Sequence, residues 1–411
     1  MKILQVNKFN YLRGGAERYF LEVSRALSEA GHEVAVFSMH HPKNWTGPWN
    51  KYFVSRISFN DSKWRDYLLA PSRIIYSLEA KIKFDRLVRD FRPDIIHVHN
   101  IYHQISPSIL DVAKKYKIPV LMHVHDYKLI CPNYKLFTEG QVCYRCLGQR
   151  YCQATKHKCF RGSRVASLLV TVEMYIHHKL LKIYENGVKH YIAPSRFIAD
   201  TFSKFYYPTK NFSVLYNFID EKFLTRDINF APADYLLFYG RLSEEKGIAT
   251  LIAALDRVKN KKLKLIIAGE GPAIDKLKRE AWAFNFGRRV EFVGAKYGEE
   301  LNDLIDRARA VIIPSVWLEN MPFVLLESLA LGKIVIASKI GGMPEIITDQ
   351  VNGFLFAPGD EVDLANKIEA LEKNDLKKMA LAARQSVSNL TLDKHLLQLL
   401  DIYKKIIKQS K

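Results

Sequence analysis

The chain has 411 residues, 48% of them hydrophobic, which is enough for two or three globular domains with ordinary cores. No apolar run reaches membrane-spanning length, and residues 1–7 enter a strand without the apolar core of a signal peptide, so we expect a cytoplasmic protein. The formal net charge of +19 implies an anionic partner. The cations are dispersed, without zinc-finger spacing of the nucleic-acid type, an RNP motif or a basic tail, which disfavours nucleic acid.

The expected elements alternate between strand and helix in both halves of the chain. In the first half, strands are expected at residues 2–6, 33–37, 94–98, 119–124 and 189–193, and helices at 16–30, 71–91, 106–116 and 165–186. A polar insertion over about 127–163 interrupts this half. In the second half, strands are expected at 235–239, 264–268, 290–293, 310–313 and 334–337, followed by helices at 363–390 and 392–409.

This alternation of Val/Ile/Leu-rich strands with helices predicts parallel sheets covered on both faces. Two such sheets in succession predict an α/β chain of two doubly wound, Rossmann-like domains facing across a cleft. The expected divisions are a domain over 1–193, a domain over 194–388 and a C-terminal helix within 389–411.

The segment 45–73 mixes aromatic and basic side chains. Trp45, Trp49, Trp64 and Tyr67 alternate there with lysines and arginines, the composition of an element that lies in a membrane interface. A surface loop with a partly buried tryptophan is the alternative. The membrane interpretation predicts a peripheral protein on an anionic membrane surface.

The first strand is followed by Gly14 and Gly15 at the start of a helix, with Arg18 one turn on. Glycines there let a phosphate approach the backbone and the free N–H groups of the helix. The pattern is not G-x-G-x-x-G, and no acid occupies the usual ribose position, which argues against a nicotinamide dehydrogenase. A plain tight turn is the alternative.

Two cations flank a Gly-rich turn after the first strand of the second half. Arg241 and Lys246 lie in the stretch 240–247, which opens a helix. Together they could hold a diphosphate, arginine in bidentate fashion and lysine as a point charge. A pair of exposed surface cations is the alternative.

Glu319 and Glu327 bracket an expected helix start. Pro322 occupies a first-turn position, so the N–H groups of the next residues, Phe323, Val324 and Leu325, would point toward a bound anion. Two carboxylates around an anion site suit a ligand with hydroxyls at both ends and phosphate between them, as in a sugar nucleotide.

Histidines close the third and fourth expected strands of the first half. His97 and His99 end one, and His123 and His125 end the other, where side chains line the crevice of an open sheet. Such H-x-H pairs could suggest metal. The chain contains no D-x-D, so a carboxylate-held divalent cation on a diphosphate is not expected.

With these motifs the chain resembles the family-4 retaining glycosyltransferases, which have the GT-B fold. The matching residues follow one another in family order over about residues 1–390: Gly14-Gly15 with Arg18, His125-Asp126, Ala193-Pro194-Ser195, Asn217, Gly240-Arg241 with Lys246-Gly247, Glu319 with Glu327, and Gly341-Gly342 with Glu345. The resemblance implies an acceptor-side first domain, a nucleotide-sugar-binding second domain, and a C-terminal helix that crosses back to the first.

The resemblance also implies roles for these residues. Arg241 and Lys246 would bind the donor diphosphate, Glu319 would bind sugar hydroxyls and Glu327 the ribose hydroxyls. His125 would sit beside the anomeric carbon. The remaining donor contacts would come from the glycine-rich turn at Gly14, Gly15 and Arg18 and from the backbone of Phe323, Val324 and Leu325. Catalysis would require no metal cofactor, since fixed cations can stabilise the leaving diphosphate.

All five cysteines lie between Cys131 and Cys159. Four are spaced as Cys143-x2-Cys146-x5-Cys152-x6-Cys159, and Cys-x2-Cys is a common zinc-ligand spacing. The polar insertion has few apolar residues, so a structural zinc would explain its order, with His157 as an alternative ligand. Reduced thiols or disulfides are the alternatives.

We therefore expect a glycosyltransferase that builds cell-surface polysaccharide at the inner face of the cell membrane. The expected donor is a UDP-sugar, with a GDP-sugar as runner-up, and the expected acceptor is a glycan or a polyprenyl-diphosphate-linked glycan. A nucleotide-sugar 2-epimerase of the same fold is the alternative enzyme. A non-enzymatic nucleotide binder is a third class, against which the set of Arg241, Lys246, Glu319 and Glu327 argues.

Overall fold

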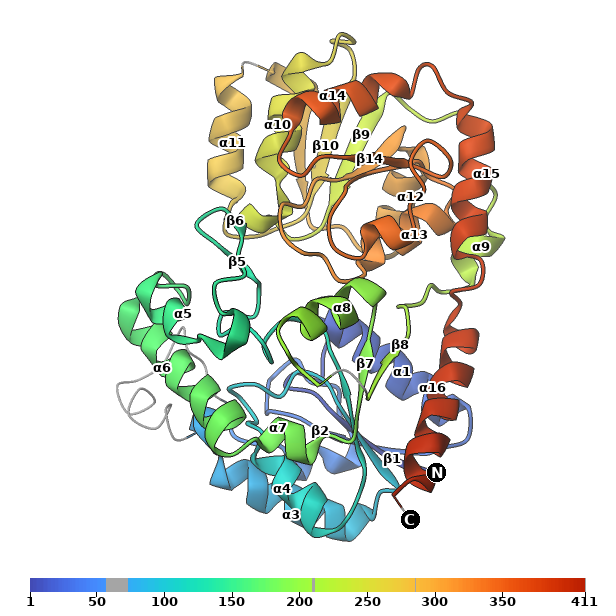
Figure 1. The fold of residues 1–411 in the computed structure, drawn as a ribbon. Helices are drawn as coiled ribbons and strands as arrows, with labels where there is room; N and C mark the ends of the chain where they lie inside the picture. Colours follow the sequence, from blue (N-terminus) through green and yellow to red (C-terminus); the bar gives the residue numbers. More distant parts are fainter. Residues whose placement is uncertain (57–72, 209–210, 285, 411) are drawn as a thin grey trace. The chain divides into compact units, whose positions relative to one another are not determined.

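The computed structural model describes residues 1–56, 73–208, 211–284 and 286–410, and the chain divides into two compact units (Figure 1). The first unit comprises Met1–Leu136, Cys143–Tyr216 and His395–Lys411, and the second comprises Phe137–Val142 and Asn217–Lys394. Each unit contains one six-stranded parallel sheet. Among the described residues, no helix is both long enough and apolar enough to cross a membrane.

The sheet of the first unit has the strand order β2-β1-β3-β4-β7-β8. Its strands, in chain order, are β1 (Lys2–Val6), β2 (Glu33–Phe37), β3 (Ile95–Val98), β4 (Val120–His123), β7 (His190–Ala193) and β8 (Phe212–Val214). Both β3 and β4 are buried along their whole length, as expected for central parallel strands. The strand order reverses direction between β1 and β3, and such a switch point is where open α/β sheets bind ligands.

Helices pack around this sheet: α1 (Gly15–Glu29), α3 (Leu78–Phe91), α4 (Ser108–Lys115), α5 (Cys152–Lys156), α6 (Arg164–Tyr175), α7 (Ile183–Gly187), α8 (Arg196–Lys204) and α16 (Leu392–Lys408). The C-terminal helix α16 belongs to this unit. Its Tyr403 is fully buried and its hydroxyl lies 2.6 Å from Nδ1 of His97 and 3.4 Å from Nε2 of Gln5. A short antiparallel hairpin, β5 (Phe137–Thr138) and β6 (Gln141–Val142), lies within the insertion.

Two helices of the first unit differ from the sequence expectation. Of the helix expected over 71–91, α3 begins only at Leu78, after its N-cap Ser77. The prediction of a single helix over 165–186 is wrong: α6 ends at Tyr175, a π-helical turn follows at Ile176–Leu180, and Lys182, with φ of 47°, separates this turn from α7. The first unit also includes α8 and β8, and β8 pairs with β7 in parallel register.

The sheet of the second unit has the order β11-β10-β9-β12-β13-β14. Its strands are β9 (Tyr235–Tyr239), β10 (Lys264–Ala268), β11 (Val290–Gly294), β12 (Ala310–Ile313), β13 (Val335–Ser338) and β14 (Phe354–Phe356). Its switch point lies between β9 and β12. Strand β14 was not predicted from the sequence, because a three-residue strand is too short to give a periodic pattern.

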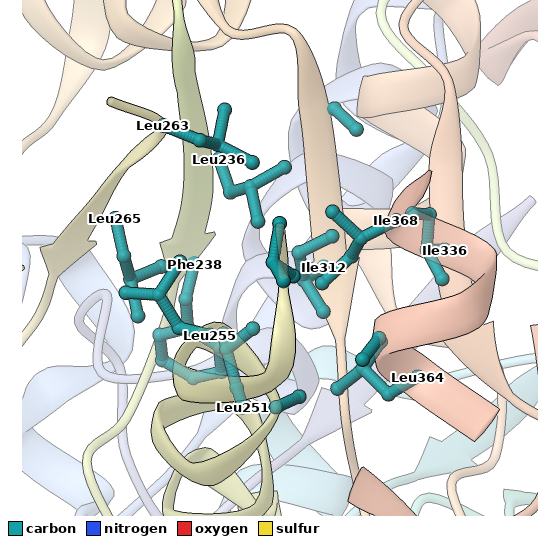
Figure 2. Packing of buried hydrophobic residues seen from close by; sticks show 14 of the residues in the cluster. Leu236, Phe238, Leu251, Leu255, Leu263, Leu265, Ile312, Ile336, Leu364 and Ile368 are labelled. Carbon is teal, nitrogen blue, oxygen red and sulfur yellow. The ribbon is translucent and has the colours of Figure 1, made fainter. Parts of the chain in front are cut away.

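The helices of the second unit are α9 (Lys222–Thr225), α10 (Ile248–Arg257), α11 (Ile274–Ala283), α12 (Gly298–Arg307), α13 (Phe323–Ala330), α14 (Glu361–Ala370) and α15 (Leu376–Val387). Figure 2 shows α10 and α14 packing their leucine and isoleucine side chains against β9 and β12. Full burial of such a side chain contributes about 1.5–3 kcal/mol. This core therefore fixes the end of β9, from which the first candidate loop departs.

Candidate active site

The switch point of the second unit brings together the two loops that carry the predicted donor site. One follows β9 (residues 240–247) and the other follows β12 (residues 314–321). The N–H of Val316 donates to the carbonyl of Glu245 at 3.0 Å. A Cβ on Gly247, where φ is +66°, would lie 1.9 Å from the carbonyl oxygen of Pro314. Only glycine therefore permits the two loops to approach this closely.

Lys246 and Glu319, predicted separately from two motifs, form one ion pair at this point. Nζ of Lys246 lies 2.7 Å from Oε1 of Glu319, and the hydroxyl of Ser315 donates to the same oxygen at 2.6 Å. Glu319 is buried, with 4% of its surface exposed. The carboxylate therefore keeps its place through two charge-assisted hydrogen bonds in a setting with little water.

The two predicted cations differ in their surroundings. Lys246 also lies over the ring of Trp317, 5.4 Å from its centroid, a cation–π contact. Arg241 is exposed, and its side chain makes no hydrogen bond or ion pair with any residue that the structure describes. One cation is thus held in position, while the other is available to an anion from solvent.

Helix α13 begins at Phe323, one residue later than predicted, because Pro322 is the N-cap in extended conformation rather than the first helical residue. Of the three predicted donors, the N–H of Leu325 is already used, since it donates to the carbonyl of Pro322 at 3.1 Å. Glu327 lies in this helix and is 8% exposed. The hydroxyl of Tyr239, at the end of β9, donates to the carbonyl of Val324 at 3.0 Å, which ties the helix start to the sheet.

A third glycine turn, after β13, supports the Glu319 backbone. The N–H of Gly342 donates to the carbonyl of Glu319 at 2.8 Å. A Cβ on Gly341 would lie 2.0 Å from the same carbonyl oxygen, and φ of Gly341 is +66°. The position of Glu319 therefore depends on a residue without a side chain more than twenty positions later in the chain.

In the first unit, Gly14 and Gly15 lie at the switch point and open α1. Gly14 is the N-cap and supplies no side-chain cap, while the acidic Glu17 lies in the first turn, with a carboxylate oxygen 3.6 Å from where a Cβ on Gly14 would be. The side chain of Arg18 makes a hydrogen bond within α1: its Nε donates to Glu22 at 2.8 Å, one helical turn further along the chain.

The four strand-end histidines of the first unit form one stack, in which His97, His99 and His123 are buried and His125 is partly exposed. Ring centroids lie 4.3 Å apart for His97 and His99 and for His123 and His125. Nδ1 of His99 lies 2.9 Å from Nε2 of His125, which links the two pairs. The two H-x-H segments therefore contact each other across adjacent parallel strands.

Burial makes these imidazoles neutral. It lowers the pKa of His125 to about 3, with the positive charge of Lys8 as a further cause, and it lowers the pKa values of His97, His99 and His123 well below the ordinary value. The predicted contact of His125 with a sugar would therefore be made by a neutral hydrogen-bonding ring.

Sequence reasoning missed a set of buried charges beside these histidines. Nζ of Lys128 lies 2.8 Å from Oε2 of Glu173, and both side chains are at most 2% exposed. Burial alone would raise the pKa of Glu173, but Lys128 and the hydrogen-bonded His103 hold it below its usual value. Asp126, whose pKa burial raises, faces Lys8 and Lys128. The charged residues just after β1 and β4 were the sequence signal from which these buried charges could have been predicted.

The cysteines are free thiols in different surroundings. Cys131 and Cys146 are buried, Cys143 and Cys159 are partly buried, and Cys152 is exposed at the start of α5. Within the described part of the chain, no three or more His, Cys, Asp or Glu side chains are grouped to hold a metal ion. The four-cysteine zinc site therefore stays a prediction from spacing.

The aromatic and basic segment is only partly described. Trp49 packs edge-on against Phe91 with centroids 5.1 Å apart, so it is a structural residue, while Trp45 is 54% exposed. Trp64 and Tyr67 lie outside the described residues.

Two family models match the chain, one in each half. The model "Glycosyltransferase Family 4" matches residues 13–223, and "Glycosyl transferases group 1" matches residues 222–389. The two matches meet near the division between the structural units.

Relatives and solved structures agree with these matches. The chain is 26% identical over 362 residues to an "Uncharacterized 42.6 kDa protein in cps region" of Klebsiella pneumoniae, covering 84% of this chain and 87% of that protein. It is 30% identical over 364 residues to the phosphatidylinositol N-acetylglucosaminyltransferase gpi3 subunit of Schizosaccharomyces pombe, covering 87% and 70%. The fold matches that of Anabaena Alr3699/HepE in complex with UDP, with a TM-score of 0.70, 18% identity and coverage of 98% and 100%.

Proposed function

Because the chain belongs to the family-4, group 1 glycosyltransferases, we propose that it transfers a sugar from a nucleotide-sugar donor to a glycan or lipid-linked glycan, with retention of anomeric configuration and without a metal. The ion pair between Lys246 and Glu319 carries this proposal, because it joins a cation suited to phosphate and a carboxylate suited to sugar hydroxyls. These are the two chemical halves of the donor where the bond must break.

The second unit supplies the donor site in this proposal. Breaking the bond between sugar and phosphate develops negative charge on the diphosphate, which Lys246 and Arg241 would stabilise. Glu319 would accept hydrogen bonds from sugar hydroxyls at Oε2, because Lys246 and Ser315 both bond Oε1. Glu327, on the first turns of α13, would hold the ribose hydroxyls.

The substrate assignment rests on two similarities. The structural neighbour from Anabaena was solved with UDP, which favours a UDP-sugar over the GDP-sugar runner-up. The Klebsiella relative lies in a cps region, which supports a role in cell-surface polysaccharide synthesis at the inner face of the cell membrane. The first unit, with neutral His125, would serve the acceptor.

The test is the turnover of the Lys246→Ala and Arg241→Ala variants. Turnover is measured as the release of nucleotide from each of a panel of nucleotide sugars in the presence of an acceptor extract. Loss of a preorganised charge should lower turnover at saturating donor by about a hundredfold or more. Lys264→Ala is the matched control, because Lys264 pairs with Glu291 on the surface of the same unit. Near-normal turnover of both cation variants would contradict the proposal, and conversion of the donor sugar without acceptor would indicate the epimerase.

A further inference from the structure

Helix α6 and the π-helical turn that follows it carry apolar side chains on their outer face. Val165, Leu168 and Val172 share one side of α6 at helical spacing, and Leu180 and Leu181 follow at the end of the turn. These five side chains, named here the outer stripe, are between 40% and 80% exposed. Isolated exposed apolar residues are ordinary, but a continuous row marks an interaction surface.

The inner face of the same helix already provides its packing. Ser167, Val170, Thr171, Glu173 and Met174 are buried in the first unit. Figure 1 shows α6 beside α5 on the outside of that unit. The outer stripe is therefore not required to attach α6 to the fold, and its exposed apolar side chains lie opposite the face that packs.

The charges around the outer stripe have one sign. Residues 152–183 contain six lysines and arginines and a single acid, Glu173, which is buried on the inner face. Arg161 and Arg164 are exposed at one end of the stripe, and Lys179 and Lys182 at the other. Long cationic side chains can lay their stems along apolar surface while their charges reach an anionic layer.

We propose that the outer stripe is a docking surface for an anionic lipid membrane. Apolar side chains between clusters of lysine and arginine match the acyl boundary and the phosphate headgroups, respectively. A protein partner is less well matched, because interface cores are enriched in aromatic residues and depleted in lysine, whereas the stripe contains only Val and Leu. A second copy of the chain would place cations opposite cations.

The inference deepens the proposed action on a lipid-linked acceptor, but its test is separate because vesicle binding needs no sugar donor. Flotation with phosphatidylglycerol-containing vesicles should carry the wild-type protein at low ionic strength and release it at high ionic strength. Leu168→Gln with Leu180→Gln should lower binding by at least about tenfold, since two apolar anchors are lost while helix propensity is kept. Leu397→Gln, which changes a leucine of α16 that is 69% exposed, should bind as wild type.

Four results would overturn the assignment of this surface to membrane docking. Unchanged vesicle binding by the double variant would contradict it, as would equal wild-type binding to neutral phosphatidylcholine vesicles. A lower melting temperature of the double variant would show that the stripe packs against the chain itself. A wild-type dimer that the double variant converts to monomer would instead assign the surface to self-association. Unchanged melting and monomeric behaviour with lost flotation support the proposal.

Discussion

Lys246 and Glu319 are 73 positions apart in the chain, and the lysine Nζ lies 2.7 Å from a carboxylate oxygen whose second partner is Ser315. The pair forms because β9 and β12 are neighbours in the sheet and their loops leave the same edge. Each residue holds the other in orientation, so a test must separate stability from chemistry.

A double variant makes this separation. Lys246→Ala should lower the free energy of unfolding of the second unit by about 1–3 kcal/mol, because buried Glu319 loses a charged partner. Adding Glu319→Gln removes the uncompensated charge and should restore part of that stability without restoring turnover. Urea unfolding and turnover are measured on the same samples. Recovery of turnover together with stability would mean that the pair is only structural.

Gly341 offers a test of Glu319 position that leaves Glu319 itself intact. Gly341→Ala places a Cβ about where the carbonyl oxygen of Glu319 lies, so Glu319 must move and donor affinity should fall by at least about tenfold. Gly298→Ala is the control, since Gly298 also has positive φ, +57°, but its Cβ would meet nothing within 4 Å. Equal donor affinities of the two variants, from fluorescence titration, would contradict this dependence.

The buried histidines predict acid sensitivity of the first unit. Burial lowers the pKa of His125 to about 3 and of His395 to about 4, while the unfolded chain has about 6.5. Below pH 6.5 the unfolded chain binds more protons, so stability is full above that pH and falls toward pH 4. Each such histidine contributes up to about 1.4 kcal/mol per pH unit to the decrease in the free energy of unfolding on acidification.

His123→Phe tests this account. His123 is fully buried, and neither ring nitrogen has a hydrogen-bond partner among the described residues. The variant should keep its stability near neutral pH and lose stability less steeply on acidification. Hydrogen exchange of β3 and β4 amides, measured over a pH series, reports this slope; equal slopes for variant and wild type would refute the account.

The thiols should react in an order set by burial. Burial raises the pKa of the Cys131 thiol to about 11, and burial also raises that of Cys146, whereas Cys152 is exposed. A thiol reagent on native protein should therefore modify Cys152 first and Cys131 and Cys146 only on unfolding. Protection of Cys152 that a chelator removes, with about one zinc per chain by elemental analysis, would instead support the four-cysteine metal site.

The sequence predicted the two doubly wound sheets because buried parallel strands appear as continuous runs of Val, Ile and Leu, as in β12 and β13. It also predicted Lys246 and Glu319 as functional residues, because each follows a strand and a turn. It did not predict that they form an ion pair, since that contact depends on strand order in the sheet.

Side-chain contacts between distant segments were not predictable in the same way. The pairing of Lys128 with Glu173 joins residues 45 positions apart in segments that lack a shared motif. The break before α7 depends on the left-handed conformation of Lys182, a residue type that ordinarily continues a helix. Periodicity alone therefore gave one helix where the structure has two and a π-helical turn.

The measurement that tests the central claim most directly is calorimetric titration of UDP and GDP into wild-type, Lys246→Ala and Lys264→Ala protein in the presence of EDTA. The account predicts that wild type binds one of the two nucleotides without a metal, that Lys264→Ala binds it equally well, and that Lys246→Ala binds it at least about tenfold more weakly. Binding of neither nucleotide, binding that EDTA abolishes, or equal affinities of Lys246→Ala and wild type would contradict the account.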